Sequence, residues 1–144
     1  MHVAITTTPD DDAVKTVKAG MRAYEVSRLP GLPDESEDVP VAVFAREDDG
    51  SLCGGLLGNL YWDGLEIEVL WVDESRRGER IGATLVERAE TFAREKGAVI
   101  AYLKTVDAKG FYESLGYVVF GTLEDRPIGT VLFHMKKRLD AGTG

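Results

Sequence analysis

The stretch from Leu70 to Leu85, with the sequence LWVDESRRGERIGATL, constrains the fold more than any other part of the chain. It begins with an apolar, β-prone run, continues through a basic loop with two glycines, and ends in a segment with apolar residues at helical spacing. The sequence therefore predicts a strand, a tight loop and a helix in direct succession. The first N–H groups of a helix lack main-chain partners and carry partial positive charge, so this arrangement suits a phosphate.

The loop between the predicted strand and helix offers both space and charge for an anion. Gly78 and Gly82 allow a ligand to approach the main chain without a Cβ in the way. Three arginines, Arg76, Arg77 and Arg80, supply forked donors that match phosphate oxygens. The alternative is a solvated turn in which the arginines face water and the glycines only form the turn. The loop alone leaves both interpretations open.

The length and charge of the chain narrow the possible functions. The 144 residues suffice for one domain with a sizeable core, which we expect over residues 1–139, followed by a flexible tail at 140–144. The net charge of -8 argues against nucleic acid as the main partner, because binding its phosphates needs a basic face. An acidic surface instead favours a cationic acceptor such as an amine. The arginine loop is therefore a local exception.

Cysteine and histidine usage gives no sign of a disulfide or a metal site. Cys53 is the only cysteine, which excludes an intrachain disulfide and fits a reducing compartment. His2 and His134 have no ligand partner at metal spacing, so we expect no metal. The N-terminal segment lacks a basic region followed by an apolar run, and no apolar stretch reaches membrane-spanning length. These features predict a cytoplasmic protein that does not bind a membrane.

The order of the apolar patterns predicts a mixed α/β fold. The strands expected at 65–72 and 98–103 flank a helix, and a right-handed crossover of this kind makes them parallel neighbours. The segment from Ser27 to Pro40 is either a solvated connection or a flap over an acceptor site. Further strands are expected at 3–7, 41–46, 52–60, 117–123 and 130–138, and helices from about residue 10 to before Pro30, at 82–96 and at 108–115.

A second motif, FYESLGY, lies at Phe111 to Tyr117. With the strand before it, the basic loop resembles the R/Q-x-x-G-x-G/A signature of the acetyl-CoA-dependent N-acetyltransferases of the GNAT superfamily. FYESLGY is similar to the FYEKLGF-type segment of the same superfamily, and the two motifs occur in the family's order. One departure concerns Arg80, which stands where the signature has its middle glycine. If that position requires a positive φ, the arginine carries backbone strain; otherwise its side chain is free to contact a phosphate.

The resemblance implies a GNAT-like α/β (α+β) fold with a mixed, mostly antiparallel central sheet of about seven strands, a parallel strand pair and helices on both faces. In that family the parallel strands splay apart, and acetyl-CoA enters between them with its pyrophosphate on the loop amides. The implied acceptor is a primary amine of a small molecule or peptide, and a homodimer through the last strands is compatible with the family. The implied coenzyme-binding residues are Leu70, Trp71, Val72, Arg77, Gly78, Glu79, Arg80, Ile81, Gly82, Ala83 and Lys109.

Acetyl transfer to an amine needs a base and an acid. An aliphatic amine is almost wholly protonated at neutral pH and must lose a proton before it attacks. The resemblance places the acid that protonates the coenzyme sulfur at Tyr112, and the general-base glutamate of the histone-acetyltransferase branch at Glu66. Glu68 lies on the same side of the strand by alternation and either shares this role or binds a cationic acceptor. The alternatives are that Tyr112 only packs its ring and that both acids are solvated.

Two other functions stay open at the level of sequence. One is a non-catalytic module that keeps the coenzyme A pocket as a sensor or interaction domain. The other is a nucleotide-phosphate binder that uses the arginine loop without acyl transfer. The missing phosphate-loop lysine and the FYESLGY segment count against this last possibility.

Overall fold

The computed structural model describes residues 1–140, and these form two compact units. The first unit is Met1–Leu32, and the second begins at Pro33. The tail predicted at 140–144 lies outside the described residues except for Asp140. The prediction of one domain over 1–139 stays a prediction.

The first unit contains helix α1, Asp11–Arg28, in the place where the sequence predicts a helix. Asp10 caps it, because its carboxylate accepts a hydrogen bond from the Ala13 N–H at 3.0 Å. The strand predicted at 3–7 is wrong: these residues are exposed and pair with no strand of the described chain. Alternating side chains do not make a strand unless a neighbouring strand takes up its N–H and C=O groups.

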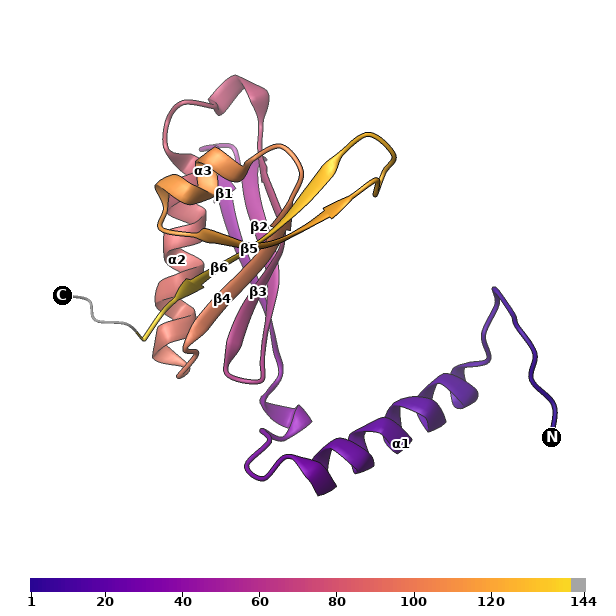
Figure 1. The fold of residues 1–144 in the computed structure, drawn as a ribbon. Helices are drawn as coiled ribbons and strands as arrows, with labels where there is room; N and C mark the ends of the chain where they lie inside the picture. The colour runs from indigo at the N-terminus through magenta and orange to yellow at the C-terminus, as the bar shows by residue number, and fades with distance from the viewer. Residues whose placement is uncertain (141–144) are drawn as a thin grey trace. The chain divides into compact units, whose positions relative to one another are not determined.

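The second unit is built on a six-stranded sheet with the strand order β1-β2-β3-β4-β6-β5 (Figure 1). Within the described chain, β3 and β4 are the one parallel pair, and the other neighbours are antiparallel. This confirms the predicted mixed sheet, with six strands instead of about seven because 3–7 does not join it. The elements are β1 (Val39–Arg46), β2 (Leu52–Tyr61), β3 (Gly64–Val72), α2 (Ile81–Glu95), β4 (Ile100–Thr105), α3 (Lys109–Ser114), β5 (Val118–Glu124) and β6 (Val131–Arg138), with short 3-10 helices η1 (Glu35–Glu37) and η2 (Glu74–Arg76).

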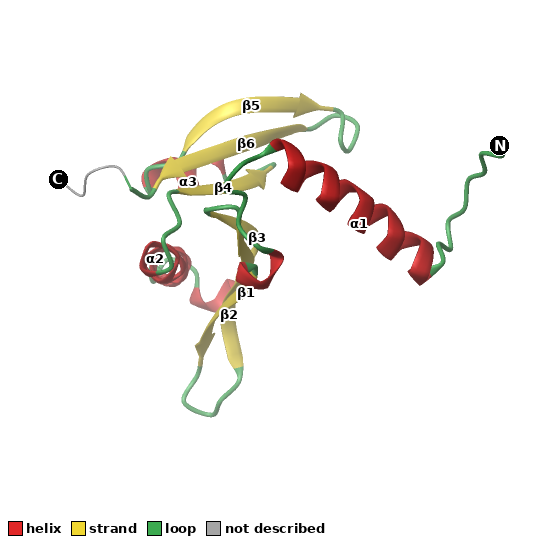
Figure 2. Cartoon of the chain, turned by 90° about the horizontal axis from the view of Figure 1, so that it is seen from below, coloured by secondary structure: helices red, strands yellow, loops and turns green. Residues whose placement is uncertain are grey.

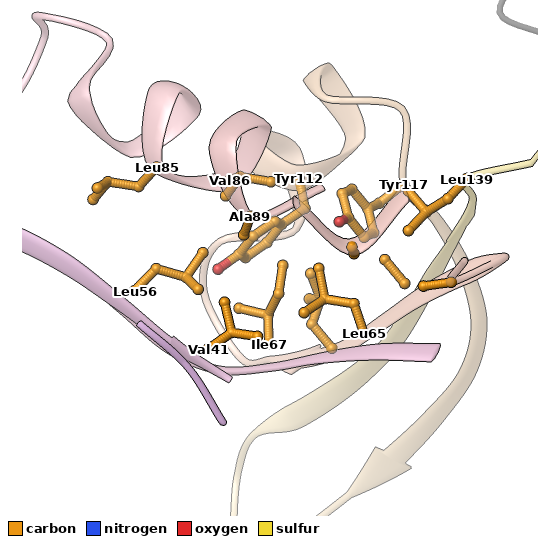
Figure 3. Packing of buried hydrophobic residues seen from close by; sticks show 14 of the residues in the cluster. Val41, Leu56, Leu65, Ile67, Leu85, Val86, Ala89, Tyr112, Tyr117 and Leu139 are labelled. Atoms are coloured by element: carbon orange, nitrogen blue, oxygen red, sulfur yellow. The ribbon is translucent and has the colours of Figure 1, made fainter. Parts of the chain in front are cut away.

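Helices α2 and α3 lie on the same side of the curved sheet (Figure 2). The hydrophobic core fills the space between these helices and the sheet, and Leu56, Leu65 and Val86 are among its fully buried side chains (Figure 3). Burying each such side chain contributes about 1.5–3 kcal/mol relative to leaving it exposed. The core therefore fixes α2 against the strands that precede and follow it in the chain.

The parallel pair β3 and β4 is hydrogen-bonded over only part of its length. Its ladder starts where Gly64 lies opposite Ile100 and ends where Ile67 lies opposite Leu103. Beyond that point β3 continues to Val72 along β2, while β4 continues along β6. The prediction of parallel neighbours is confirmed, and the two strands part at the end that leads into the basic loop. This opening positions the candidate site.

A β-bulge at Glu68 changes the alternation of side chains along β3. The adjacent β2 residues Leu57 and Gly58 pair with β3 residues that are two apart, so Glu68 is the extra residue. Before the bulge, the odd-numbered residues of the strand are buried in the core. After it the even-numbered residues turn inward, and Leu70 and Val72 are half-buried. The bulge thus lies where the two parallel strands separate.

Gly58 lies opposite this bulge, where an added Cβ would overlap the main-chain carbonyl oxygen of Glu66. We expect Gly58→Ala to lower the free energy of unfolding by about 1–3 kcal/mol, because two strand backbones must move apart. The matched control is Gly110→Ala on α3, where the same methyl group would have no atom within 4 Å. Urea denaturation measures both. Equal midpoints for the two variants would contradict this assignment of a close backbone approach.

Candidate active site

Helix α2 begins directly after the basic loop, and its first turn has no side-chain cap. The first main-chain hydrogen bond of the helix runs from the Thr84 N–H to the Arg80 carbonyl at 3.0 Å. The N–H groups of residues 81–83 therefore precede the first intrahelical bond and point off the helix end. Together with the helix dipole, these donors make the end of α2 a binding site for an oxyanion.

A cavity of about 770 Å³ opens at this end of the helix. Its walls come from the end of β3, the basic loop, the first turn of α2, helix α3 and strand β6. This volume falls within the range of small-molecule and cofactor sites. Of the predicted coenzyme-binding residues, those that line the cavity are Leu70, Trp71, Val72, Arg77, Gly78, Arg80, Ile81, Gly82 and Ala83.

Two predicted coenzyme-binding residues do not line the cavity. Glu79 lies in the loop, but its carboxylate accepts a hydrogen bond from Arg76 at 3.0 Å. Lys109 lies at the start of α3, with its Nζ 4.9 Å from the centroid of the Phe133 ring. The structure thus brings together the predicted residues of the strand, the loop and the helix, and leaves these two outside the cavity lining.

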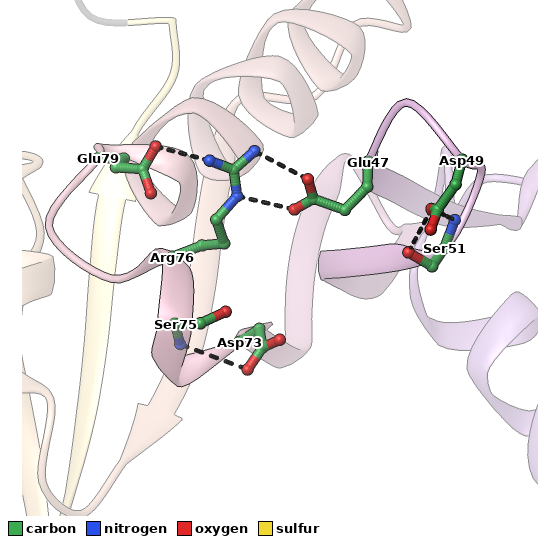
Figure 4. A network of polar contacts seen from close by, with 7 residues as sticks. All are labelled: Glu47, Asp49, Ser51, Asp73, Ser75, Arg76 and Glu79. Carbon is green, nitrogen blue, oxygen red and sulfur yellow. Dashed lines mark hydrogen bonds and ion pairs between the residues drawn. The ribbon is translucent and has the colours of Figure 1, made fainter.

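Arg76 is held by carboxylates on both sides (Figure 4). Its Nε and Nη2 donate to the two carboxylate oxygens of Glu47 at 2.7 and 3.1 Å, and its Nη1 donates to Glu79. The hydrogen bonds and charge of Glu47 raise the pKa of Arg76. Arg76 therefore joins the turn between β1 and β2 to the loop. It also lines the cavity, and its contact with an anion stays a prediction.

The other two arginines are less constrained. Arg77 Nε lies 3.4 Å from the Val72 carbonyl oxygen, at the long end of the range for a hydrogen bond. Arg80 forms an ion pair with Glu87 at 3.2 Å, and both side chains are more than half exposed. Such an exposed pair contributes little to stability and is easily exchanged for another partner. Arg77 and Arg80 are therefore the cations available to an anion in the cavity.

Arg80 adopts a left-handed backbone conformation, with φ 62° and ψ 19°. The position thus requires a positive φ, which explains why a glycine suits it. We expect Arg80→Gly to raise the free energy of unfolding by about 1 kcal/mol, because it removes strain of that order. The matched control is Arg77→Gly, where φ is already -68°, so no strain is relieved. Urea denaturation of both variants checks this, and equal losses of stability would contradict it.

A buried polar cluster supports the far wall of the cavity. Glu90 of α2 is 2% exposed, and its carboxylate accepts hydrogen bonds from the Tyr117 hydroxyl at 2.8 Å and from Lys137 Nζ at 2.9 Å. Lys137 also donates to the Leu115 carbonyl at 2.8 Å, just beyond the end of α3. Burial and the Glu90 charge raise the pKa of Tyr117, so its hydroxyl remains a donor. The cluster joins α2, α3 and β6.

Sequence reasoning missed most of this wall. Glu90 and Lys137 both line the cavity, yet 47 positions separate them, and neither belongs to a motif. Phe111 does belong to the FYESLGY motif, and it packs so closely that a Cβ on Gly82 would lie 3.2 Å from its ring. The glycine at position 82 was the one feature of the sequence that could have indicated the contact between Gly82 and the Phe111 ring.

The two predicted catalytic glutamates lie on the face of the sheet opposite α2. Glu66 accepts a hydrogen bond from the Tyr61 hydroxyl at 2.9 Å, and Glu68 accepts one from the Asn59 side-chain amide. Asn59 lies directly opposite Glu66 in the β2–β3 ladder and also reaches Glu68, so both acids are on one face, as predicted. The hydrogen bond to Glu66 raises the pKa of Tyr61. The catalytic roles of these acids stay predictions.

Tyr112, the predicted acid, is 7% exposed and packs in the core. Its ring meets those of Phe111 and Tyr117 edge to face, with centroids 5.0 and 5.8 Å away. The side chain extends between Ala89 of α2 and Leu56 of β2 (Figure 3). Burial raises the pKa of Tyr112, so the hydroxyl keeps its proton at neutral pH. Tyr112 does not line the cavity, and its role as the acid stays a prediction.

Two other features were sought in the described chain: a metal-binding cluster and a membrane-spanning helix. Residues 1–140 contain no group of three or more histidine, cysteine, aspartate or glutamate side chains placed to hold a metal ion. Over the same residues, no helix has the length and apolar character needed to cross a membrane.

The family model described as the acetyltransferase (GNAT) family matches residues 12–117. The chain therefore belongs to the GNAT family of acetyltransferases, which confirms the predicted family and enzyme class. The match includes the basic loop, helix α2 and the FYESLGY segment.

Individual relatives agree with this assignment. Blasticidin-S acetyltransferase of Streptomyces morookaense is 38% identical over 101 residues, which cover 68% of this chain and 74% of the relative. Acetyltransferase Atu2258 of Agrobacterium fabrum is 31% identical over 140 residues, covering 96% and 99%. The crystal structure of an acetyltransferase from Bacillus cereus superposes with a TM-score of 0.81 at 29% identity, covering 94% and 97%. The similarity to the last two extends over nearly the whole of each chain.

Proposed function

We propose that the protein transfers the acetyl group of acetyl-CoA to a primary amine of a small molecule or peptide. The observation that carries this proposal is the uncapped N-terminus of α2, which lies behind a basic loop at the end of β3. It is supported by the parting of β3 and β4 at the end of β3 that leads into this loop. The relative named blasticidin-S acetyltransferase supports a small-molecule acceptor.

The residues of the cavity fit the diphosphate and the arm of coenzyme A. Gly78 has φ +87° and no atom within 4 Å of its Cβ position, so the loop backbone is accessible there. The N–H groups of residues 81–83 would hold phosphate oxygens, and Arg77 and Arg80 would balance their charge. Leu70 and Val72 are half-buried beside the cavity and provide an apolar surface for the arm.

Acetyl transfer requires proton transfers at the amine and at the sulfur, and residues on opposite faces of the sheet carry them out. Bound acetyl-CoA supplies a thioester whose carbonyl carbon the amine nitrogen attacks, so that a C–N bond forms, the C–S bond breaks and coenzyme A leaves as its thiol. Glu66, with Glu68 beside it, takes the proton that the ammonium group must lose. The Tyr112 hydroxyl donates the proton that the departing sulfur gains, and the second proton that the nitrogen loses as the amide forms replaces it. The glutamates thus act on the attacking amine, and Tyr112 acts on the leaving sulfur.

The experiment that tests the proposed function compares thermal stabilisation by acetyl-CoA, coenzyme A, ATP and NAD, followed by a thiol-release assay with a panel of amines. A ligand at a hundred times its dissociation constant adds about 2.7 kcal/mol, which is visible as a shift in Tm. We expect stabilisation by the two coenzyme A species and amine-dependent thiol release. Stabilisation without thiol release from any amine would favour a non-catalytic sensor, and stabilisation by ATP alone would favour a nucleotide-phosphate binder.

Arg77→Ala should weaken the binding of acetyl-CoA about tenfold or more, because hydrogen bonds to charged groups contribute about 1.5–3 kcal/mol. Isothermal titration calorimetry measures the Kd. The control is Arg88→Ala, which removes the same charge from an exposed position on α2 that does not line the cavity. An equal loss of affinity in both variants would show a general effect of charge and contradict a phosphate contact.

A further inference from the structure

The face of the sheet opposite α2 carries charged side chains in a regular pattern across three strands. Glu66 of β3 lies opposite Tyr102 of β4, and Tyr102 lies opposite Lys136 of β6. In the adjacent row, Lys104 of β4 lies opposite His134 of β6. Residues that lie directly opposite each other share a face of the sheet. A carboxylate on β3 and cations on β4 and β6 therefore lie on one face, beside the opening between β3 and β4.

None of these acids and lysines forms an ion pair within the described chain. Glu66 and Glu68 are hydrogen-bonded to a phenol and an amide, which are neutral. No ion pair within residues 1–140 includes Lys104 or Lys136, and Lys136 Nζ lies 5.4 Å from the centroid of the Phe120 ring. The chain has 25 acidic and 17 basic residues. With this excess of acids, two neighbouring lysines that both lack an acidic partner are unexpected.

The strand geometry sets the distance between Glu66 and Lys136, and Lys104 lies on the strand between them. Neighbouring strands lie about 4.8 Å apart, so the main chains at Glu66 and Lys136, two strands apart, are separated by roughly 10 Å. This is about one Debye length at moderate ionic strength, so the two groups do little to neutralise each other. A molecule with a cation at one end and an anion at the other would match both ends.

Aromatic rings lie on the same face beside the lysines. The Tyr102 hydroxyl and His134 Nδ1 are 2.7 Å apart, and the two rings are stacked with centroids 6.0 Å apart and planes 20° apart. The Phe120 ring packs against both, at 5.8 and 6.1 Å. Burial, with a smaller effect of the Glu66 charge, raises the pKa of Tyr102, so its hydroxyl stays neutral. The carbon skeleton of an acceptor can rest on this surface.

We propose that the acceptor is an amine that also carries a carboxylate, as an amino acid does. Its ammonium group is held and deprotonated at Glu66 and Glu68, and its carboxylate is held by Lys104 and Lys136. This inference rests on the proposed acetyl transfer to amines and specifies which amines the site accepts. It follows because two glutamates and two lysines lie on one face of the sheet without forming ion pairs. A simple diamine would place its second cation against the lysines.

The test compares amines of equal length that differ only at the far end. The ω-amino acids from 3-aminopropanoate to 6-aminohexanoate are measured against the corresponding alkylamines and diamines in a thiol-release assay, which gives kcat/KM for each. We expect the best amino acid to exceed its matched alkylamine at least tenfold in kcat/KM, and its matched diamine by more. Preference for the diamines, or equal values in all three series, would overturn the inference and leave the proposed function intact.

Lysine variants test whether Lys104 and Lys136 cause the preference for amino acids over alkylamines. Lys104→Met combined with Lys136→Met should lower the ratio of kcat/KM between amino acid and alkylamine about tenfold. The control is Lys96→Met at the C-terminal end of α2, which removes a lysine that lies elsewhere, over the Phe92 ring, and should keep the ratio. A ratio unchanged in the double variant would overturn the assigned carboxylate site. Absence of transfer to every amine, with coenzyme binding intact, would overturn the proposed function and this inference together.

Discussion

Tyr112→Phe should lower kcat about 100-fold or more and leave the Kd for acetyl-CoA nearly unchanged. A positioned acid that protonates a leaving group typically contributes 10²–10⁴-fold to the rate, and phenylalanine keeps the ring but not the hydroxyl. The ring is what packs against Phe111 and Tyr117, so the core should survive the change. Steady-state thiol release gives kcat, and calorimetry gives the Kd.

The control for this variant is Tyr24→Phe, which removes an exposed hydroxyl from α1. A fall in kcat of less than threefold in Tyr112→Phe would restrict Tyr112 to packing. The pH dependence gives a second criterion. Because burial raises the pKa of Tyr112 above its ordinary value of 10.0, the acid keeps its proton at neutral and mildly alkaline pH. Loss of this proton should therefore reduce the wild-type rate only above about pH 10.

Lys137→Met should lower the free energy of unfolding by about 3–5 kcal/mol, the range seen when one partner of a buried ion pair is removed. The Glu90 side chain is 3% exposed, so the change would leave a buried carboxyl group without its cationic partner, and the Leu115 carbonyl would lose a donor. Urea denaturation measures the change. Lys136→Met is the matched control, because this neighbouring lysine is exposed on the other face of β6 and should change stability by less than about 0.5 kcal/mol.

A double variant separates the charge of Glu90 from the packing of Lys137. Adding Glu90→Gln to Lys137→Met removes the unpaired buried charge, while the amide oxygen still accepts the hydrogen bond from Tyr117. We expect the double variant to be more stable than Lys137→Met alone. If it is less stable, lost packing and not an uncompensated charge explains the single variant.

Local patterns predicted most of the fold because each depends on residues close together in the chain. Helical spacing from Ile81 and the continuous apolar run before Thr105 identify α2 and β4, and their order gives the parallel pair with β3. The strand expected at 3–7 failed because pairing with a distant strand, which alternation does not encode, decides whether a strand forms. Six strands result.

The site was predictable where it is built from contiguous residues. The loop from Arg77 to Ala83 forms one wall of the cavity, and the doubt raised by Arg80 is resolved by its left-handed conformation. The role of Arg76 was not predictable, because Glu47, its partner, lies 29 residues earlier in a hairpin turn. The same holds for Lys137, whose partner on α2 becomes a neighbour only once the sheet has formed.

The bulge at Glu68 has a consequence for how β3 can change through evolution. The extra residue reverses the alternation of side chains, so Glu66 and Glu68 lie on one face of the sheet while Leu70 and Val72 turn to the other. Substitutions at Glu66 and Glu68 alter one face, and those at Leu70 and Val72 alter the other. Deleting Glu68 would remove the bulge and one acid and leave Leu70 and Val72 opposite their present partners on β2. The two faces of β3 can therefore change by substitution independently of each other.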